Sequence, residues 1–184
     1  MTDTFYHILK KGGVMGMDDE KCGEAAVSVV LSSHCEESTA ASRHCEEERR
    51  SNPLCKLIGF QMLHNPSQNA LVDAVATLLQ SAEKSLADID FILTGMSGNY
   101  ESDRAYREEA KTLFGDKPLL RYKHLFGESF TASGLGFYVA AQCLKAGRVP
   151  DSLFVNAKDE RSPKCILLYN RSDGKNVSLT LLEA

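Results

Sequence analysis

The clearest fold signal in this chain is FILTG (Phe91–Gly95), followed by a charged segment (Glu101–Phe114) and then LLRYKHLF (Leu119–Phe126). Short apolar runs of this kind are typical of buried strands. The charged segment has the spacing of an amphipathic helix, and Gly115 behind it is a common helix stop. A strand, a helix and a second strand in succession predict a parallel pair of strands with a helix packed on it. The chain is therefore predicted to be an α/β protein.

The same alternation continues toward the amino terminus. CKLIGFQM (Cys55–Met62) is predicted to be a strand, and AAVSVVLSS (Ala25–Ser33), which is apolar and β-branched, a further strand. Ser67–Leu86 is predicted to be a helix, because a residue able to cap it precedes apolar side chains at helical spacing. These side chains are Leu71, Val75, Leu78, Leu79, Ala82 and Leu86.

The carboxyl-terminal part adds another helix and a hairpin. Ala132–Gly147 begins with small residues and becomes apolar, and Pro150 lies just beyond it, so we expect a helix that packs closely on its neighbours. KCILLYN (Lys164–Asn170) and NVSLTLLE (Asn176–Glu183) flank Ser-Asp-Gly-Lys, which is a hairpin signal. The expected architecture is a mainly parallel sheet with helices packed on it and a C-terminal antiparallel hairpin at its edge.

A polar stretch interrupts this pattern at about residues 34–53. It is dense in charge and nearly free of large apolar side chains, so it cannot bury a core of its own. His-Cys-Glu-Glu occurs at His34 and again at His44, and we interpret the stretch as a duplicated surface insertion within one domain of residues 1–184. The alternative is a zinc site, but adjacent His-Cys pairs ten residues apart do not match the short spacing of structural zinc ligands. The ligands of that alternative would be His34, Cys35, His44, Cys45 and Cys55.

Composition excludes several classes of protein. The 184 residues are 43% apolar with a formal net charge of −4, so a basic nucleic-acid-binding face is not expected. No apolar run approaches the roughly 20 residues of a membrane helix, and the first residues do not resemble a secretory signal. We expect a cytoplasmic protein, with its six cysteines reduced and with neither a metal nor another cofactor.

Four segments carry, in order, a resemblance to one protein family. They are KCGEAA (Lys21–Ala26), ILTGMSGNYESD (Ile92–Asp103), KHLFGESFTASG (Lys123–Gly134) and SDGKN (Ser172–Asn176). With changes, they resemble the Gly-Glu-(Gly/Ala)-Ala, His-Gly-Thr-x-Thr, Lys-x-x-x-Gly-His-x-x-x-Ala-x-Gly and Phe-Gly-Gly-x-Asn motifs of β-ketoacyl-[acyl-carrier-protein] synthases. These condensing enzymes of the thiolase-like superfamily consist of two similar halves, and the motifs belong to the carboxyl-terminal half.

The resemblance implies a thiolase-like half-domain whose active-site positions are changed. In the family this half supplies two histidines and a supporting lysine, and the other half supplies the nucleophilic cysteine. The histidine positions here read Gly95 and Glu128, Lys123 matches the lysine, and Gly174 and Asn176 match the closing loop. Glycine offers no donor to an oxyanion, and an ionised glutamate would repel a developing enolate. We therefore expect no intact catalytic set.

Several residues have two interpretations. Lys123 and Glu128 are either a remnant catalytic pair or a strand-end lysine and a loop glutamate facing solvent, where an ion pair contributes about 0–1 kcal/mol. Gly134–Gly136 is either a phosphate-binding helix start or a close packing contact, and the absence of a glycine-rich phosphate motif favours packing. The charges from Glu101 to Lys111 are expected to form a solvated helix face.

The favoured hypothesis is a non-catalytic, synthase-like accessory subunit of fatty acid or polyketide-type biosynthesis. A half-fold should expose an apolar face, which usually marks an interaction site. Its expected partners are a ketosynthase-type chain carrying the other half or a second copy of itself, with an acyl carrier protein as a further candidate. The alternatives are one half of a split, active 3-oxoacyl-[acyl-carrier-protein] synthase, which Gly95 and Glu128 oppose, and a vestigial relic that folds without a function.

Overall fold

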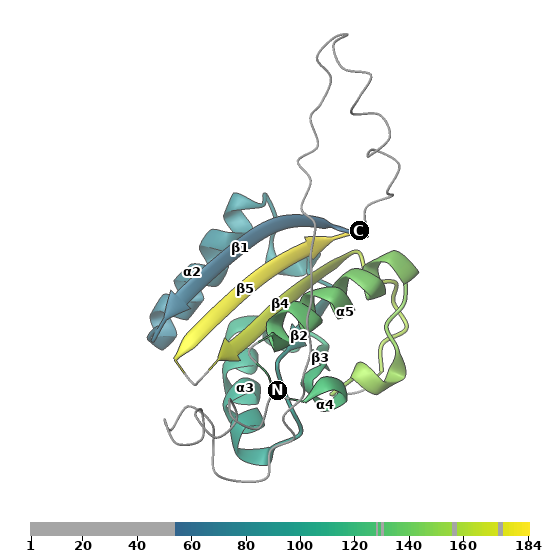
Figure 1. Ribbon diagram of the computed structural model, residues 1–184. Coiled ribbons are helices and arrows are strands. Elements are labelled where there is room, and N and C mark those ends of the chain that lie inside the picture. Colours follow the sequence, from purple (N-terminus) through teal and green to yellow (C-terminus); the bar gives the residue numbers. More distant parts are fainter. Residues whose placement is uncertain (1–53, 128, 130, 156–157, 173–174) are drawn as a thin grey trace, which may run out of the picture.

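The computed structural model describes residues 54–184 except 128, 130, 156, 157, 173 and 174 (Figure 1). Five strands form one sheet in the order β1-β5-β4-β2-β3. They are β1 (Lys56–His64), β2 (Phe91–Thr94), β3 (Leu119–Arg121), β4 (Cys165–Ser172) and β5 (Asn176–Glu183). β2 pairs in parallel with β3 and β4, whereas β5 runs antiparallel to both β4 and β1. Four strands therefore share one direction, as predicted.

The place of the hairpin in the sheet differs from the prediction. β4 and β5 do form an antiparallel hairpin, but β5 lies between β4 and β1 and is not an edge strand. The edge position belongs to β1, which pairs with β5 along its whole length. The physical reason is burial, because Val177, Leu179 and Leu181 point to one face of the sheet and Leu182 to the other, all fully buried. A strand apolar on both faces belongs inside a sheet.

Helices cover both faces of the sheet. The helices are α2 (Gln68–Ser81), α3 (Tyr100–Phe114), α4 (Lys123–Phe126) and α5 (Ala132–Ala146), with single 3₁₀ turns at Leu86–Asp88 (η2) and Asp151–Leu153 (η3). α2 and α3 share one core cluster with the sheet, and α5 forms a second cluster on the opposite face. Figure 1 shows α5 in front of the sheet and α2 behind it. The two clusters give three layers, α/β/α.

Two predicted boundaries were wrong for local reasons. The helix predicted over 67–86 begins as expected, since the Ser67 hydroxyl accepts a hydrogen bond from the backbone N–H of Ala70 (3.2 Å), but it ends at Ser81. Glu83 has a φ of +53°, a left-handed conformation that no helix continues through. LLRYKHLF is a strand only as far as Arg121, because its parallel partner β2 ends at the paired residue Thr94. Beyond that point the chain forms the short helix α4.

The predicted strand Ala25–Ser33, the motif Lys21–Ala26 and the insertion at about 34–53 lie outside the described residues. Within the described part of the chain, no helix combines the length and the apolar character needed to cross a bilayer. The predicted close packing of the small-residue helix is confirmed. A Cβ placed on Gly136 of α5 would lie 2.7 Å from Cζ of Tyr122 and 3.1 Å from Cδ1 of Leu168, so only glycine fits against this buried ring.

We expect Gly136→Ala to destabilise the protein by about 1–3 kcal/mol, although alanine is the better helix former by about 1 kcal/mol. The added methyl group must displace the Tyr122 ring. Urea unfolding followed by circular dichroism measures this effect. Ser133→Ala, at an exposed position of the same helix, is the control and should change stability by a few tenths of a kcal/mol. A stabilised Gly136→Ala variant would contradict the packing described here.

The described cysteines, Cys55, Cys143 and Cys165, are free thiols in the structure. Burial raises the pKa of Cys143 and of Cys165 from 9.0 to about 11. Because two pKa units reduce the thiolate fraction about a hundredfold, we expect iodoacetamide at pH 8 to alkylate both at least about a hundredfold more slowly in the folded than in the unfolded chain. Peptide mass spectrometry separates them from the half-buried Cys55, which serves as the internal control. Equal rates in both states would contradict their burial.

The same pKa shifts predict the alkaline limit of stability. A thiol whose pKa is raised by folding keeps its proton longer in the folded state, so stability is unaffected below about pH 9 and falls as the pH rises toward 11. Thermal melts between pH 7 and 11 measure this decline. A melting temperature that rises over that range would contradict the assignment.

Candidate functional site

The described site positions that were inferred from the sequence lie at the carboxyl ends of the parallel strands. β2, β3 and β4 run in the same direction, so their carboxyl ends lie side by side, where ligands commonly bind in α/β folds. Gly95 directly follows β2, Lys123 follows β3 at the start of α4, and Asn176 begins β5 after the hairpin turn. Glu128 and Gly174 lie outside the described residues.

Gly95 and Lys123 are brought together, and other side chains fill the space between them. A Cβ placed on Gly95 would lie 2.4 Å from Oδ1 of Asn170, 2.5 Å from the hydroxyl oxygen of Tyr106 and 3.1 Å from Cε of Lys123. Contacts below 3.0 Å require a neighbour to move. There is consequently no room at this position for any side chain, and least of all for an imidazole.

Hydrogen bonds hold the two nearest neighbours of Gly95 in place. The Tyr122 hydroxyl donates to Oδ1 of Asn170 over 3.0 Å in a fully buried bond. The Tyr106 hydroxyl accepts from the backbone N–H of Arg171 (2.7 Å) and donates to the carbonyl oxygen of the same residue (3.3 Å). Leaving a buried polar group without its hydrogen-bond partner costs about 1–3 kcal/mol of folding free energy. Moving Asn170 or Tyr106 away from Gly95 would therefore destabilise the folded state.

Lys123 is a buried lysine. Its side chain is 4% exposed, so the interpretation as a solvent-facing, strand-end lysine was wrong. The burial arises because β3 stops at Arg121 and the chain turns into α4, which directs both Tyr122 and Lys123 inward. Asn176 lies at the same end of the sheet, at the start of β5, where Nδ1 of His64 donates a hydrogen bond to its Oδ1 over 2.8 Å.

The segment after Gly95 is fixed by an aspartate. Asp103, in the first turn of α3, is 2% exposed, and its carboxylate accepts from the backbone N–H groups of Ser97 (2.9 Å) and Gly98 (3.0 Å). A negative charge is also favourable in the first turn of a helix.

The expected solvated face of α3 is confirmed for Arg104, Arg107, Glu108 and Lys111, which are exposed. It is not confirmed for Asp103, which is buried.

A second buried group supports the site from β4. The Tyr169 hydroxyl donates to the Glu109 carboxylate, which also pairs with the Arg171 guanidinium. Burial and the hydrogen bond to Glu109 raise the pKa of the Tyr169 hydroxyl, which therefore stays protonated at neutral pH. Glu109 consequently faces inward and is not part of the solvated helix face.

Sequence reasoning missed three residues of this site, Tyr106, Tyr122 and Asn170. One signal was present for Asn170, because the apolar run CILLY ends on a polar Asn-Arg pair at the carboxyl end of a strand, where sites form. Tyr106 gave none, since a tyrosine within a charged helix reads as an ordinary core residue.

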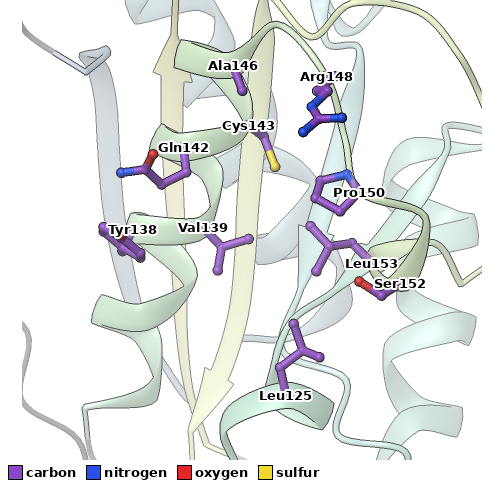
Figure 2. A pocket seen from close by; sticks show the side chains of 10 residues that line it. All are labelled: Leu125, Tyr138, Val139, Gln142, Cys143, Ala146, Arg148, Pro150, Ser152 and Leu153. Atoms are coloured by element: carbon purple, nitrogen blue, oxygen red, sulfur yellow. The ribbon is translucent and has the colours of Figure 1, made fainter.

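A separate apolar groove of about 270 Å³ lies beside α5. It runs between α5, Leu125 of α4 and the segment around η3. Figure 2 shows Val139 and Cys143 extending from α5 on one side, with Leu125 at one end and Arg148 at the other. Its lining is Leu125, Tyr138, Val139, Gln142, Cys143, Ala146, Arg148, Pro150, Ser152 and Leu153. Of the inferred site positions that the structure describes, Gly95, Lys123 and Asn176 do not line it. Within the described residues, no three His, Cys, Asp or Glu side chains are grouped so as to hold a metal ion.

Comparison of the sequence with known protein families and with curated proteins finds no match. Solved structures do match. The ishigamide ketosynthase/chain length factor is 16% identical to this chain, with a TM-score of 0.64, and the match covers 100% of this chain and 52% of that chain. A ketosynthase in complex with its type II PKS acyl-carrier protein is 15% identical with a TM-score of 0.61 over 78% of this chain and 41% of that chain. A β-ketoacyl synthase from Burkholderia phymatum is 14% identical with a TM-score of 0.57 over 78% and 40%.

These matches define the class of fold. The chain has the thiolase-like fold of the ketosynthases, as the motifs in the sequence implied. This chain spans about half the length of the ishigamide ketosynthase/chain length factor chain. At these identities the likeness concerns the fold alone.

Proposed function

We propose that this chain is a ketosynthase-like accessory subunit of polyketide or fatty acid-type biosynthesis that does not itself catalyse condensation. The single observation that carries this proposal is the filled space at Gly95, where Asn170, Tyr106 and Lys123 leave no room for a side chain. In the ketosynthases that the motifs resemble, this position holds a catalytic histidine.

The chemistry of condensation supports the same conclusion. A developing oxyanion needs preorganised donors, and each donor removed costs about 10²–10³ in rate. Gly95 supplies no side-chain donor, and the second histidine position reads Glu128, whose carboxylate would repel a developing enolate. Lys123 is retained at the family's lysine position, but one buried lysine does not replace two imidazoles.

The partner we propose is another ketosynthase-type polypeptide. The motifs belong to one half of a two-half fold, and the chain spans 52% of the ishigamide ketosynthase/chain length factor chain. In a fold of two packed halves, each half presents an apolar face to the other, and such a face is where we propose that the partner binds. An acyl carrier protein is a further proposed partner, by analogy with the carrier-protein complex among the matching structures.

Affinity capture tests the accessory role against the relic. The tagged chain is expressed at native level in its host beside an untagged copy, and the recovered proteins are quantified by mass spectrometry. We expect a ketosynthase-type polypeptide, either a separate ketosynthase or the untagged copy, at close to one per tagged chain. Recovery of the tagged chain alone would contradict the proposal and would favour a vestigial protein.

A further inference from the structure

The short helix α4 (Lys123–Phe126) contributes little apolar burial of its own. Leu125 is 51% exposed and Phe126 is 37% exposed. His124, the second residue of α4, is half-buried, and both of its ring nitrogens lie inside the protein. Neither nitrogen has a hydrogen-bond partner among the described residues. Buried polar groups normally have partners, and segments with little apolar burial are the ones that open most easily.

The His124 ring lies where α4 meets η3. Phe154, directly after η3, bridges antiparallel to Leu120 of β3. The residues of η3 before Phe154 therefore run alongside the end of β3, which places Ser152 beside the start of α4. Ser152 and Leu125 also line the same groove, to which η3 and α4 contribute one residue each of this pair (Figure 2).

The surroundings of this ring oppose its protonation. Burial, and next the positive charge of Arg121, lower the pKa of His124 below its ordinary value of 6.5. Arg121 ends β3 and carries its charge at every physiological pH. Its buried Nε likewise has no hydrogen-bond partner among the described residues. The imidazole and the guanidinium thus share a poorly satisfied interior, which favours a neutral imidazole.

The carboxylates of the neighbouring elements are engaged elsewhere. Asp103 of α3 accepts hydrogen bonds from two backbone N–H groups of its own loop. Asp151 of η3 pairs with Lys158. The Ser152 backbone and the Asp103 carboxylate favour the charged ring, but less strongly than burial and Arg121 oppose it. The other ionisable residue of α4 is Lys123, which is buried.

We propose that α4 is an acid-sensitive latch, which protonation of His124 releases from η3. An added proton would leave an unpaired charge in the interior near the Arg121 guanidinium, whereas a ring in water is solvated. The closed state therefore keeps its full advantage above pH 6.5 and loses it as the pH falls below that value. Release would widen the groove at Leu125 and bring Lys123 to solvent. This property requires no partner and is independent of the proposed function.

Hydrogen exchange of the full chain at pH 7.5 and pH 5.5 tests the latch. Peptide mass spectrometry follows the exchange, with correction for its intrinsic pH dependence. We expect peptides that cover α4 and η3 to lose protection about three- to tenfold at pH 5.5, and tenfold is the limit for one histidine whose open-state pKa is 6.5. Peptides of α2 should not change. Equal protection of α4 at both pH values would overturn the proposal.

Two histidine variants make the test specific. His124→Gln is neutral at both pH values and should abolish the loss of protection. His64→Gln removes an exposed histidine of β1 and should leave that loss unchanged. A loss that persists in His124→Gln would overturn the proposal, because another group would then carry the response.

A titration of the histidine ring resonances by NMR does not depend on the folding of any variant. The His124 ring should titrate below pH 6.5 in the native chain, and a midpoint at or above 6.5 would overturn the proposal. Arg121→Gln removes the neighbouring positive charge, so it should raise this midpoint and reduce the loss of protection at pH 5.5. A midpoint that stays unchanged or falls would contradict the part assigned to Arg121.

Discussion

Gly95→His is expected to lower the free energy of unfolding by about 3 kcal/mol or more and to restore no condensing chemistry. The first added carbon already lies 2.4 Å from Oδ1 of Asn170 and 2.5 Å from the Tyr106 hydroxyl oxygen. Both atoms are hydrogen-bonded and buried or half-buried. Displacing Asn170 or Tyr106 to accommodate the imidazole would therefore break these hydrogen bonds and leave their partners unsatisfied in the interior. Urea unfolding at pH 7 measures the loss. A fully stable variant with the new imidazole in the site would contradict our description of Gly95.

Two further variants make this prediction specific. Gly95→Ala carries only the clashing Cβ and should cost about 1–3 kcal/mol. Tyr106→Phe removes one of the two contacting oxygens, so the double variant Gly95→Ala/Tyr106→Phe should lose less stability than the sum of the single variants, with a coupling of about 0.5–3 kcal/mol. Strict additivity would show that the clash is not the cause.

Tyr169→Ala should be the most destabilising truncation near the site, at about 3–5 kcal/mol. Tyr169 is fully buried and packs edge-on against Tyr106 (5.7 Å between ring centroids) and Phe114 (5.8 Å). Its removal leaves a cavity beneath the residues that fill the Gly95 position.

Tyr169→Phe is the matched variant. It keeps the ring and removes only the hydroxyl that donates to Glu109, which still pairs with Arg171. We expect it to cost about 1–2 kcal/mol, and equilibrium unfolding separates the two variants. Equal losses for both would mean that the hydrogen bond, and not the packed ring, holds this region.

Much of the fold was predictable because its signals are local. Apolar runs, the Ser67 cap, Gly115, Gly147 and the Ser-Asp-Gly-Lys turn each mark an element or its end within a few residues. The position of β5 was not predictable in this way, because strand order depends on which strand buries both of its faces. The end of β3 at Arg121 likewise depends on the length of β2, which lies more than twenty residues earlier in the chain.

The site was predictable only in outline. Motif order located Gly95 and Lys123, and the structure brings these two together. What fills the space was not predictable, because Tyr106, Tyr122 and Asn170 come from three elements that meet only in the folded sheet. The roles of Gly95, Lys123, Glu128, Gly174 and Asn176 remain proposals that follow from the resemblance.

Decarboxylation of a malonyl-acyl carrier protein tests the central claim most directly. The assay uses the full chain in its assembled form, with any captured partner, and compares it with a folded Lys123→Met chain in the same assembly. We predict that this chain adds no decarboxylation activity, so both assemblies should decarboxylate malonyl-acyl carrier protein at the same rate. If no separate ketosynthase is present, that rate should equal the background rate. Turnover above background that is lost on Lys123→Met would contradict the account and identify the chain as half of an active synthase.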